Sequence, residues 1–238
     1  DKRTKDLLAL LKPPGVLPRL TNSGEISNKG FEFSASWNQR ISNDLNLTVA
    51  GNLTTYNNKV ISLNEIIPSD PQFPNQTEAG KPIGYFVGYI VEGLYQSYSD
   101  ILRSPVNNVS GPPAQPGDFK YKDVNNDGVI DDLDRTEIGN PTPDFTYGAS
   151  LNLNYKKFDF GVDIGGVYGN EIYRYWSTSE QKNSVYNYPK YFLEAWNGEG
   201  TSNWVPIVNA RHLKNRAPSS FGIEDGSYVR IRNIGVGY

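Results

Sequence analysis

Apolar and polar residues alternate strictly along several stretches of the chain. Between residues 31 and 37 the odd positions carry Phe, Phe, Ala and Trp, and the even positions carry Glu and Ser. The alternation returns between residues 45 and 54, after a short polar stretch at 38–44. Because successive side chains of a β-strand point to opposite faces, this pattern predicts two strands with one apolar face each, joined as an antiparallel hairpin.

A second hairpin is predicted at 145–164, where alternation runs to Tyr155 and resumes at Phe158 after two lysines. Strands of about ten residues fit a tilted membrane-crossing β-strand better than the ~5–6 residues of an ordinary globular strand. Aromatic residues near the strand ends fit the belts that flank the lipid-facing band of a membrane barrel; they are Tyr56, Tyr155, Tyr168 and Tyr173. Alternation alone also fits a soluble β-sandwich, whose apolar face is a dry core.

The connections between these strands differ greatly in length. The two hairpin turns are short, whereas 95–143 and 175–226 are long and rich in Pro, Asn and Tyr. Outer-membrane barrels have short turns on the periplasmic side and long loops outside. For both short turns to lie on one side, the stretch between the hairpins must contain an even number of crossings. We therefore expect 81–95 either to supply two crossings with its neighbours or to fold outside the wall.

The composition suits a chain of many short strands and turns. The 238 residues are 37% hydrophobic and 13% aromatic, with 23 Gly, 16 Pro and no Cys. Without cysteine, no disulfide, CxxC redox pair or thiolate metal site is possible. A mean hydropathy of −0.56, with no apolar run near the ~18–20 residues of a transmembrane helix, excludes a helical membrane protein. A net charge of −3 without a basic, aromatic-rich cluster argues against a nucleic-acid partner.

The acidic segment 123–134 is a candidate metal site. A calcium loop of the EF-hand type supplies oxygens from positions 1, 3, 5, 7, 9 and 12, with Gly at position 6. The predicted ligands are Asp123, Asn125, Asp127, the backbone carbonyl of Val129, Asp131 and Asp134, with Gly128 at the bend and Ile130 as apolar anchor. Asp134 replaces the usual longer Glu, and no helical pattern flanks the segment. We expect an isolated structural calcium loop; a solvated acidic turn is the alternative.

Several motifs, in order along nearly the whole chain, resemble the SusC/RagA-type TonB-dependent outer-membrane transporters of Bacteroidetes. The most distinctive is GKPIGYFVGY at 80–89, followed by EGLYQ at 92–96. The others lie at 28–32, 117–123, 138–148, 166–173 and 224–233.

The resemblance implies an all-β segment of a large antiparallel transmembrane β-barrel of about 22 strands, with long extracellular loops. Residues 1–238 would be part of that single barrel domain, with the plug and TonB box before residue 1, and we expect the chain to be cut at both ends. The implied function is TonB-dependent nutrient uptake across the bacterial outer membrane. Implied partners are outer-membrane lipid, a SusD-like surface lipoprotein, a glycan or peptide substrate, and the TonB complex, engaged through the absent N-terminal part.

No enzyme constellation stands out. His212 is the sole histidine, GxSxG and HExxH patterns are missing, and nothing fixes a separation between the carboxylates of Glu180, Glu194 and Glu199. Aromatic residues of the second long loop are expected to pack that loop against the partner lipoprotein or against itself rather than stack on sugars. They are Trp176, Trp196, Trp204, Tyr186, Tyr188 and Tyr191.

A second hypothesis is a secreted, calcium-stabilised β-sandwich that binds carbohydrate or mediates adhesion. The two hypotheses predict opposite surroundings for seven apolar side chains, which would face lipid in a barrel and a second sheet in a sandwich. These residues are Leu45, Leu47, Val49, Leu151, Leu153, Phe160 and Val162.

Overall fold

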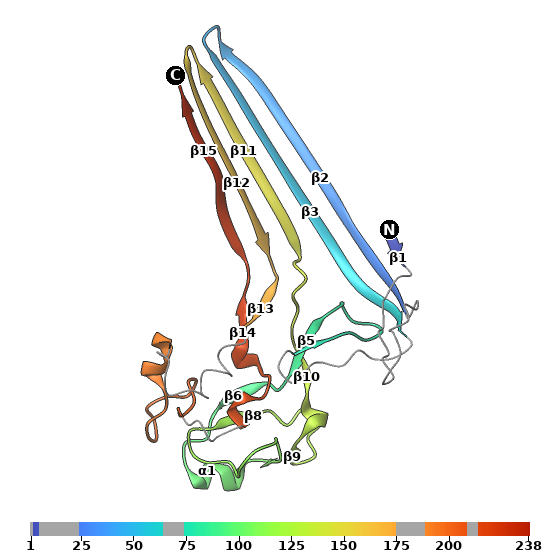
Figure 1. Cartoon of the computed structure of the whole chain (residues 1–238), viewed down its shortest axis with the longest axis vertical. Coiled ribbons are helices and arrows are strands. Elements are labelled where there is room, and N and C mark those ends of the chain that lie inside the picture. The colour runs from blue at the N-terminus through green and yellow to red at the C-terminus, as the bar shows by residue number, and fades with distance from the viewer. Residues whose placement is uncertain (1, 5–23, 64–73, 175–188, 209–213) are drawn as a thin grey trace, which may run out of the picture.

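The computed structural model describes residues 2–4, 24–63, 74–174, 189–208 and 214–238, and these are mostly β-strand. Its main feature is a six-stranded antiparallel sheet (Figure 1). In spatial order the strands are β1 (Lys2–Thr4), β2 (Gly24–Ser42), β3 (Leu45–Leu63), β11 (Phe145–Tyr155), β12 (Phe158–Tyr168) and β15 (Tyr228–Gly237). The predicted all-β, antiparallel fold class is confirmed.

Both predicted hairpins are present. The turn between β2 and β3 is Asn43–Asp44, and the turn between β11 and β12 is Lys156–Lys157. Lys156 has a φ of 55°, the left-handed backbone that two-residue hairpin turns favour. Its backbone N–H donates to the carbonyl oxygen of Asp44 at 2.8 Å, so both short turns lie at the same end of the sheet, as predicted.

The first hairpin is longer than its alternating pattern predicts. β2 and β3 have 19 residues each, about twice the ~9–11 residues that cross a bilayer. Their pairing continues through a polar stretch in which Asn28 pairs with Asn58 and Lys29 with Asn57. Backbone pairing between β2 and β3 continues through this stretch, although its residues show no alternating apolar pattern from which the strands could have been predicted.

Strand register sorts the side chains into two faces. One face carries apolar rows that run across the sheet, such as Trp37, Val49, Leu151, Val162 and Ile234. The opposite face carries polar or small rows, such as Ser36, Ala50, Ser150, Asp163 and Asn233. We call these the apolar face and the polar face.

Strand β15 keeps its apolar residues on one face by means of a bulge. The register shifts between Asp163 and Ile164 of β12, which pair with Asn233 and Ile231 of β15. Arg232 is therefore an extra residue in β15, and a β-bulge of this kind leaves one residue outside the ladder.

The apolar face is uncovered. Phe31 and Val236 are 83% and 77% exposed, and no second sheet of the described residues packs on this face. Aromatic pairs lie toward both ends of the strands: Phe158 and Tyr238 have ring centroids 4.8 Å apart, and Phe145 and Tyr168 stack at 5.0 Å.

Two of the four residues predicted for aromatic belts lie elsewhere. Tyr155 and Tyr168 occupy the apolar face, pairing with Phe158 and Phe145. Tyr56 pairs with Gly30 one position beyond the Phe31–Thr55 pair, and strand alternation therefore puts it on the polar face. Tyr173 lies in the short strand β13, outside the six-stranded sheet.

The other described residues (74–144, 169–174, 189–208 and 214–227) form what we call the loop region, which gathers beyond the sheet end opposite the short turns (Figure 1). Its strands are β4 (Asn75–Gln76), β5 (Tyr85–Gly88), β6 (Val91–Leu94), β7 (Val106–Asn107), β8 (Phe119–Tyr121), β9 (Val129–Ile130), β10 (Thr136–Gly139), β13 (Glu171–Tyr173) and β14 (Ile223–Asp225). Its helices are α1 (Tyr98–Arg103) and the 3-10 turns η1 (Asp132–Asp134), η3 (Lys190–Glu194), η4 (Lys214–Arg216) and η5 (Ser220–Gly222). They pair as β10-β5-β4, β6-β8, β7-β9 and β13-β14.

The loop region has a hydrophobic core of its own, made of Tyr89, Val91, Leu94, Val109, Phe119, Tyr121, Ile130 and Phe221. The rings of Phe119 and Phe221 lie 4.9 Å apart. The Tyr121 hydroxyl donates to the backbone carbonyl of Lys214 at 2.7 Å, and burial raises the pKa of this tyrosine. Because β3 pairs directly with β11, residues 81–95 fold outside the wall, which was one of the two predicted alternatives.

Candidate functional site

The acidic loop 123–134 connects β8 to β10 and is anchored in the core of the loop region. Ile130 is 0% exposed, as expected for the apolar anchor. β9, which contains Ile130, pairs in parallel with β7. Gly128 has a φ of 88°, the left-handed backbone that explains glycine at the bend.

Backbone N–H groups fix the direction of most predicted ligands. The Asp123 carboxylate accepts from the N–H of Asp127 at 3.2 Å and from that of Gly128 at 2.8 Å. Asn125 Oδ1 accepts from the same Asp127 N–H at 2.9 Å, and Asp127 Oδ1 accepts from Val129 N–H at 2.8 Å. The backbone of the loop thus orients the side chains of Asp123, Asn125 and Asp127.

Asp134 closes the loop from its far end. It is fully buried, with Oδ1 accepting from Val124 N–H at 2.8 Å and Oδ2 accepting from Asp131 N–H at 2.9 Å. Asp131 in turn accepts from Leu133 N–H at 2.8 Å. The sequence pattern predicts Asp134 as a calcium ligand, which stays a prediction, and it did not predict that Asp134 links the two ends of the loop by hydrogen bonds.

The donor chemistry of the loop fits calcium, which takes 6–8 oxygen ligands. Each carboxylate oxygen that accepts one N–H keeps a second lone pair for a cation. Within the described residues, however, no three acidic or histidine side chains converge closely enough to hold a metal ion. Coordination would require these carboxylates to turn toward a common centre.

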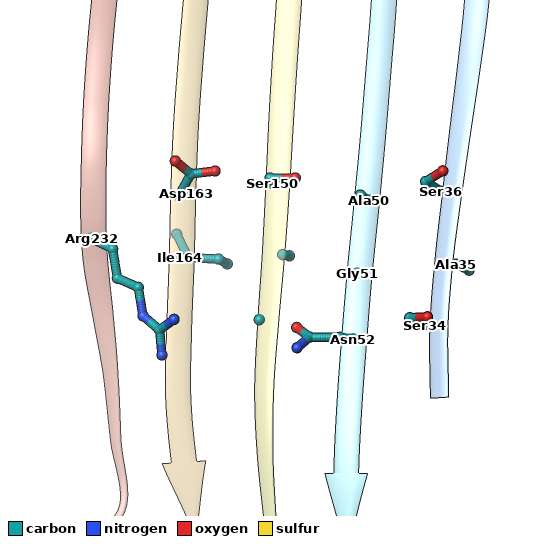
Figure 2. A pocket seen from close by; sticks show the side chains of 12 residues that line it. Ser34, Ala35, Ser36, Ala50, Gly51, Asn52, Ser150, Asp163, Ile164 and Arg232 are labelled. Carbon is teal, nitrogen blue, oxygen red and sulfur yellow. The ribbon is translucent and has the colours of Figure 1, made fainter. Parts of the chain in front are cut away.

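A second candidate is a pocket of about 650 Å³ on the polar face of the sheet (Figure 2). Its polar lining consists of Ser34, Ser36, Asn52, Ser150, Asp163 and Arg232. Small residues such as Ala50 and Gly148 leave the space open. Sequence reasoning missed this pocket; the available signals were an arginine within an alternating strand and Gly165, which lies inside β12 because that strand continues to Tyr168, beyond the predicted 145–164 hairpin.

The remaining candidates give no site within the described residues. Glu194 and Glu199 are exposed, while His212 and Glu180 lie outside the described residues. Trp196 packs against the core of the loop region and donates to Gln96 Oε1 at 3.2 Å, as the packing interpretation predicts. Trp176, Tyr186 and Tyr188 lie outside the described residues.

None of the helices in the described residues is long and apolar enough to span a membrane.

Curated relatives align with almost the entire chain. TonB-dependent receptor P3 of Formosa agariphila is 33% identical over 99% of this chain, and TonB-dependent receptor P26 of the same organism is 27% identical over 100%. TonB-dependent receptor SusC of Bacteroides thetaiotaomicron is 26% identical over 100%. The chain spans 24%, 25% and 23% of these relatives, or about a quarter of their length. No family model matches the chain.

The fold matches a solved transporter structure. The RagAB peptide transporter superposes with a TM-score of 0.74 over 98% of this chain and 25% of that chain, at 18% identity. The RagAB peptide importer in its 'open-open' state gives 0.71 over the same shares. These relatives are receptors and a transporter, which confirms the prediction that the chain is not an enzyme.

Proposed function

We propose that this chain, a relative of the SusC/RagA-type TonB-dependent receptors of the bacterial outer membrane, supplies wall strands and external loops to a nutrient transporter. One observation carries the proposal: the six-stranded sheet has an apolar face that nothing among the described residues covers. A transmembrane barrel turns such a face to lipid and its polar face to the lumen. The remaining strands of the barrel would come from the rest of a longer protein.

The alternative, a calcium-stabilised sandwich, needs a second sheet over the apolar face. Val49 and Phe160 are instead exposed, and Leu151 and Val162 are only half-buried. The small sheets of the described loop region have two or three strands each and lie beyond the end of the long sheet. This arrangement favours the transporter.

Partners and cargo follow from the same proposal. A SusD-like lipoprotein would sit over the loop region, which has its own core and thus offers a folded external surface. The TonB complex would act through the N-terminal part of the longer protein. The cargo would be oligosaccharides or peptides; the RagAB structure is described as a peptide transporter.

We also propose that residues 123–134 hold a structural calcium ion. Asp123, Asn125, Asp127, the Val129 carbonyl, Asp131 and Asp134 would supply its oxygens. Support comes from the backbone hydrogen bonds that orient these groups and from the buried anchor Ile130. A bound cation would neutralise carboxylates that otherwise repel one another within a short loop.

Paired cysteine variants of the full-length receptor in lipid vesicles test the wall assignment. The chain has no cysteine of its own, and the rest of the receptor would be freed of any others. A water-soluble maleimide should label Asn152→Cys and Ala50→Cys on the polar face, and a lipid-soluble maleimide should label the neighbouring Leu151→Cys and Val49→Cys. Protection of both apolar-face positions from both reagents would indicate a dry core and defeat the proposal.

A further inference from the structure

We propose that the pocket on the polar face is a carboxylate-binding subsite of the transport path, with Arg232 as its cation. The inference rests on the proposed function, because it takes the polar face as the wall of the path. It adds the chemical class of the group that is bound and the residue that binds it.

The position of Arg232 comes from the bulge in β15. Its side chain lies across Gly165 of β12: a Cβ atom at Gly165 would be 2.6 Å from Arg232 Nε and 2.8 Å from Nη2, closer than real Cβ contacts. Only glycine at position 165 admits this arrangement. The guanidinium therefore reaches over β12 toward the middle of the sheet, and not toward the open edge of β15 (Figure 2).

A second polar group approaches from the other side. Gly148 of β11 pairs with Gly165, and the Asn52 side chain lies over Gly148, where a Cβ atom would collide with Asn52 Oδ1. Two paired glycines thus form a floor between an amide and a guanidinium. Ser34 pairs with Asn52 in the same row and adds a hydroxyl.

Among the described residues, the side chain of Arg232 takes part in no ion pair or hydrogen bond. The acidic residue in the lining, Asp163, accepts instead from Asn233 Nδ2 at 3.4 Å. Arg230, two positions away on the same face, lies over the ring of Tyr228 at 5.5 Å. Within the described part of the chain, the donors of Arg232 are therefore available to a group that enters the pocket.

This chemistry fits a carboxylate. A guanidinium offers donors in a planar fork that matches a carboxylate bidentately. The surrounding amide and serine hydroxyls suit the amides of a peptide or the hydroxyls of a sugar, and about 650 Å³ is within the usual range of ligand pockets. A peptide C-terminus and a uronic acid both carry the required group, and we assign it to the transported molecule.

The test uses the full-length receptor in detergent and calorimetric titration with two pairs of probes. One pair is a Gly/Ser pentapeptide as free acid and as C-terminal amide; the other is trigalacturonate and a neutral trisaccharide. At least one acid should bind more tightly than its neutral counterpart. Arg232→Gln should weaken that acid by about ten- to hundredfold, the range expected for hydrogen bonds to a charged group, and should leave the neutral probe unchanged.

Arg230→Gln is the matched control, because it removes the same charge from the same face and strand. It should leave acid binding within about twofold of the wild type. Gly165→Ala should displace the Arg232 side chain and reproduce the loss, whereas Gly161→Ala, where the nearest atom to a new Cβ is Asn152 Oδ1 at 3.0 Å, should reproduce it much less. If Arg232→Gln weakens binding of the peptide acid alone, the cargo is a peptide. If it weakens binding of the uronate alone, the cargo is an acidic glycan.

The subsite is refuted if neither acid binds more tightly than its neutral counterpart, or if Arg230→Gln and Arg232→Gln weaken binding equally. It is also refuted if Arg232→Gln leaves acid binding unchanged, and a rise in the ion conductance of that variant in planar bilayers would then show what the side chain contacts instead. That result would assign Arg232 to a carboxylate of the receptor's own plug. In each of these cases, labelling of Asn152→Cys by the water-soluble reagent would still support the barrel-wall proposal. The two proposals can therefore fail separately.

Discussion

The long sheet and the loop region place the same kinds of residue in opposite surroundings. Phe31 of β2 is 83% exposed, whereas Phe119 of β8 is 1% exposed. The loop region buries its aromatic residues against one another, as a soluble domain does. The sheet leaves its own uncovered, so its apolar residues can contribute to stability only when a second medium, which is lipid in the proposed barrel, covers them.

The largest difference between the two regions is expected when a buried side chain is removed from the core of the loop region. Phe119→Ala should lower the local stability of that region by about 3–5 kcal/mol, because a buried aromatic is replaced by a cavity. Hydrogen exchange of β6, β8 and η5 in the full-length receptor would measure the loss. Phe31→Ala is the control and should leave those amides unchanged, and the heat resistance of the barrel should survive both changes. Barrel unfolding in the Phe119 variant would show that the two regions are one cooperative unit.

A positive charge should destabilise the sheet to very different extents at two adjacent residues. Leu151→Arg puts a guanidinium on the apolar face, which the proposal turns to lipid, and should cost about 2–4 kcal/mol if it lies near the middle of the bilayer. Asn152→Arg puts the same group on the polar face and should cost far less. Urea unfolding of the receptor from lipid vesicles compares the two variants. Equal losses would contradict the assignment of the faces.

Calcium should affect the loop region alone, and less strongly. Calcium at a hundredfold excess over its dissociation constant would stabilise its loop by about 2.7 kcal/mol. Chelation, or Asp127→Ala, should therefore make residues 117–140 easier to cleave by protease without changing barrel unfolding. Asp132→Asn removes a charge from a residue outside the predicted ligand set, and it should keep the response to calcium. Identical cleavage with and without calcium in the wild type would refute the bound ion.

The sequence predicted the wall far better than the loop region, for a physical reason. A strand with two different surroundings must alternate, so Phe145–Tyr155 could be recognised from its pattern alone. The strands of the loop region have two to four residues and are held by contacts between distant segments, such as Phe119 with Phe221. A segment of two residues has no period to detect, and its partner cannot be read from its neighbours.

In the candidate sites, too, features set by local spacing were predicted, whereas features set by packing or strand register were not. The bend at Gly128 and the anchor Ile130 follow from local spacing, and both were predicted. The burial of Asp134 depends on the packing of the whole loop, and the calcium set stays a prediction. The pocket at Arg232 depends on register between β12 and β15, since only that register brings Gly165 beneath the guanidinium.

The bulge in β15 also joins two alternating patterns, one with its apolar residues at odd positions and one with them at even positions. Its apolar residues fall on odd numbers at Val229 and Ile231 and on even numbers at Ile234 and Val236. In a regular strand one of these two pairs would lie on the polar face, and the single extra residue lets both pairs lie on the apolar face. Deleting Arg232 would therefore remove the charge and the bulge together, and the remaining residues would alternate regularly with Val229, Ile231, Ile234 and Val236 still on one face.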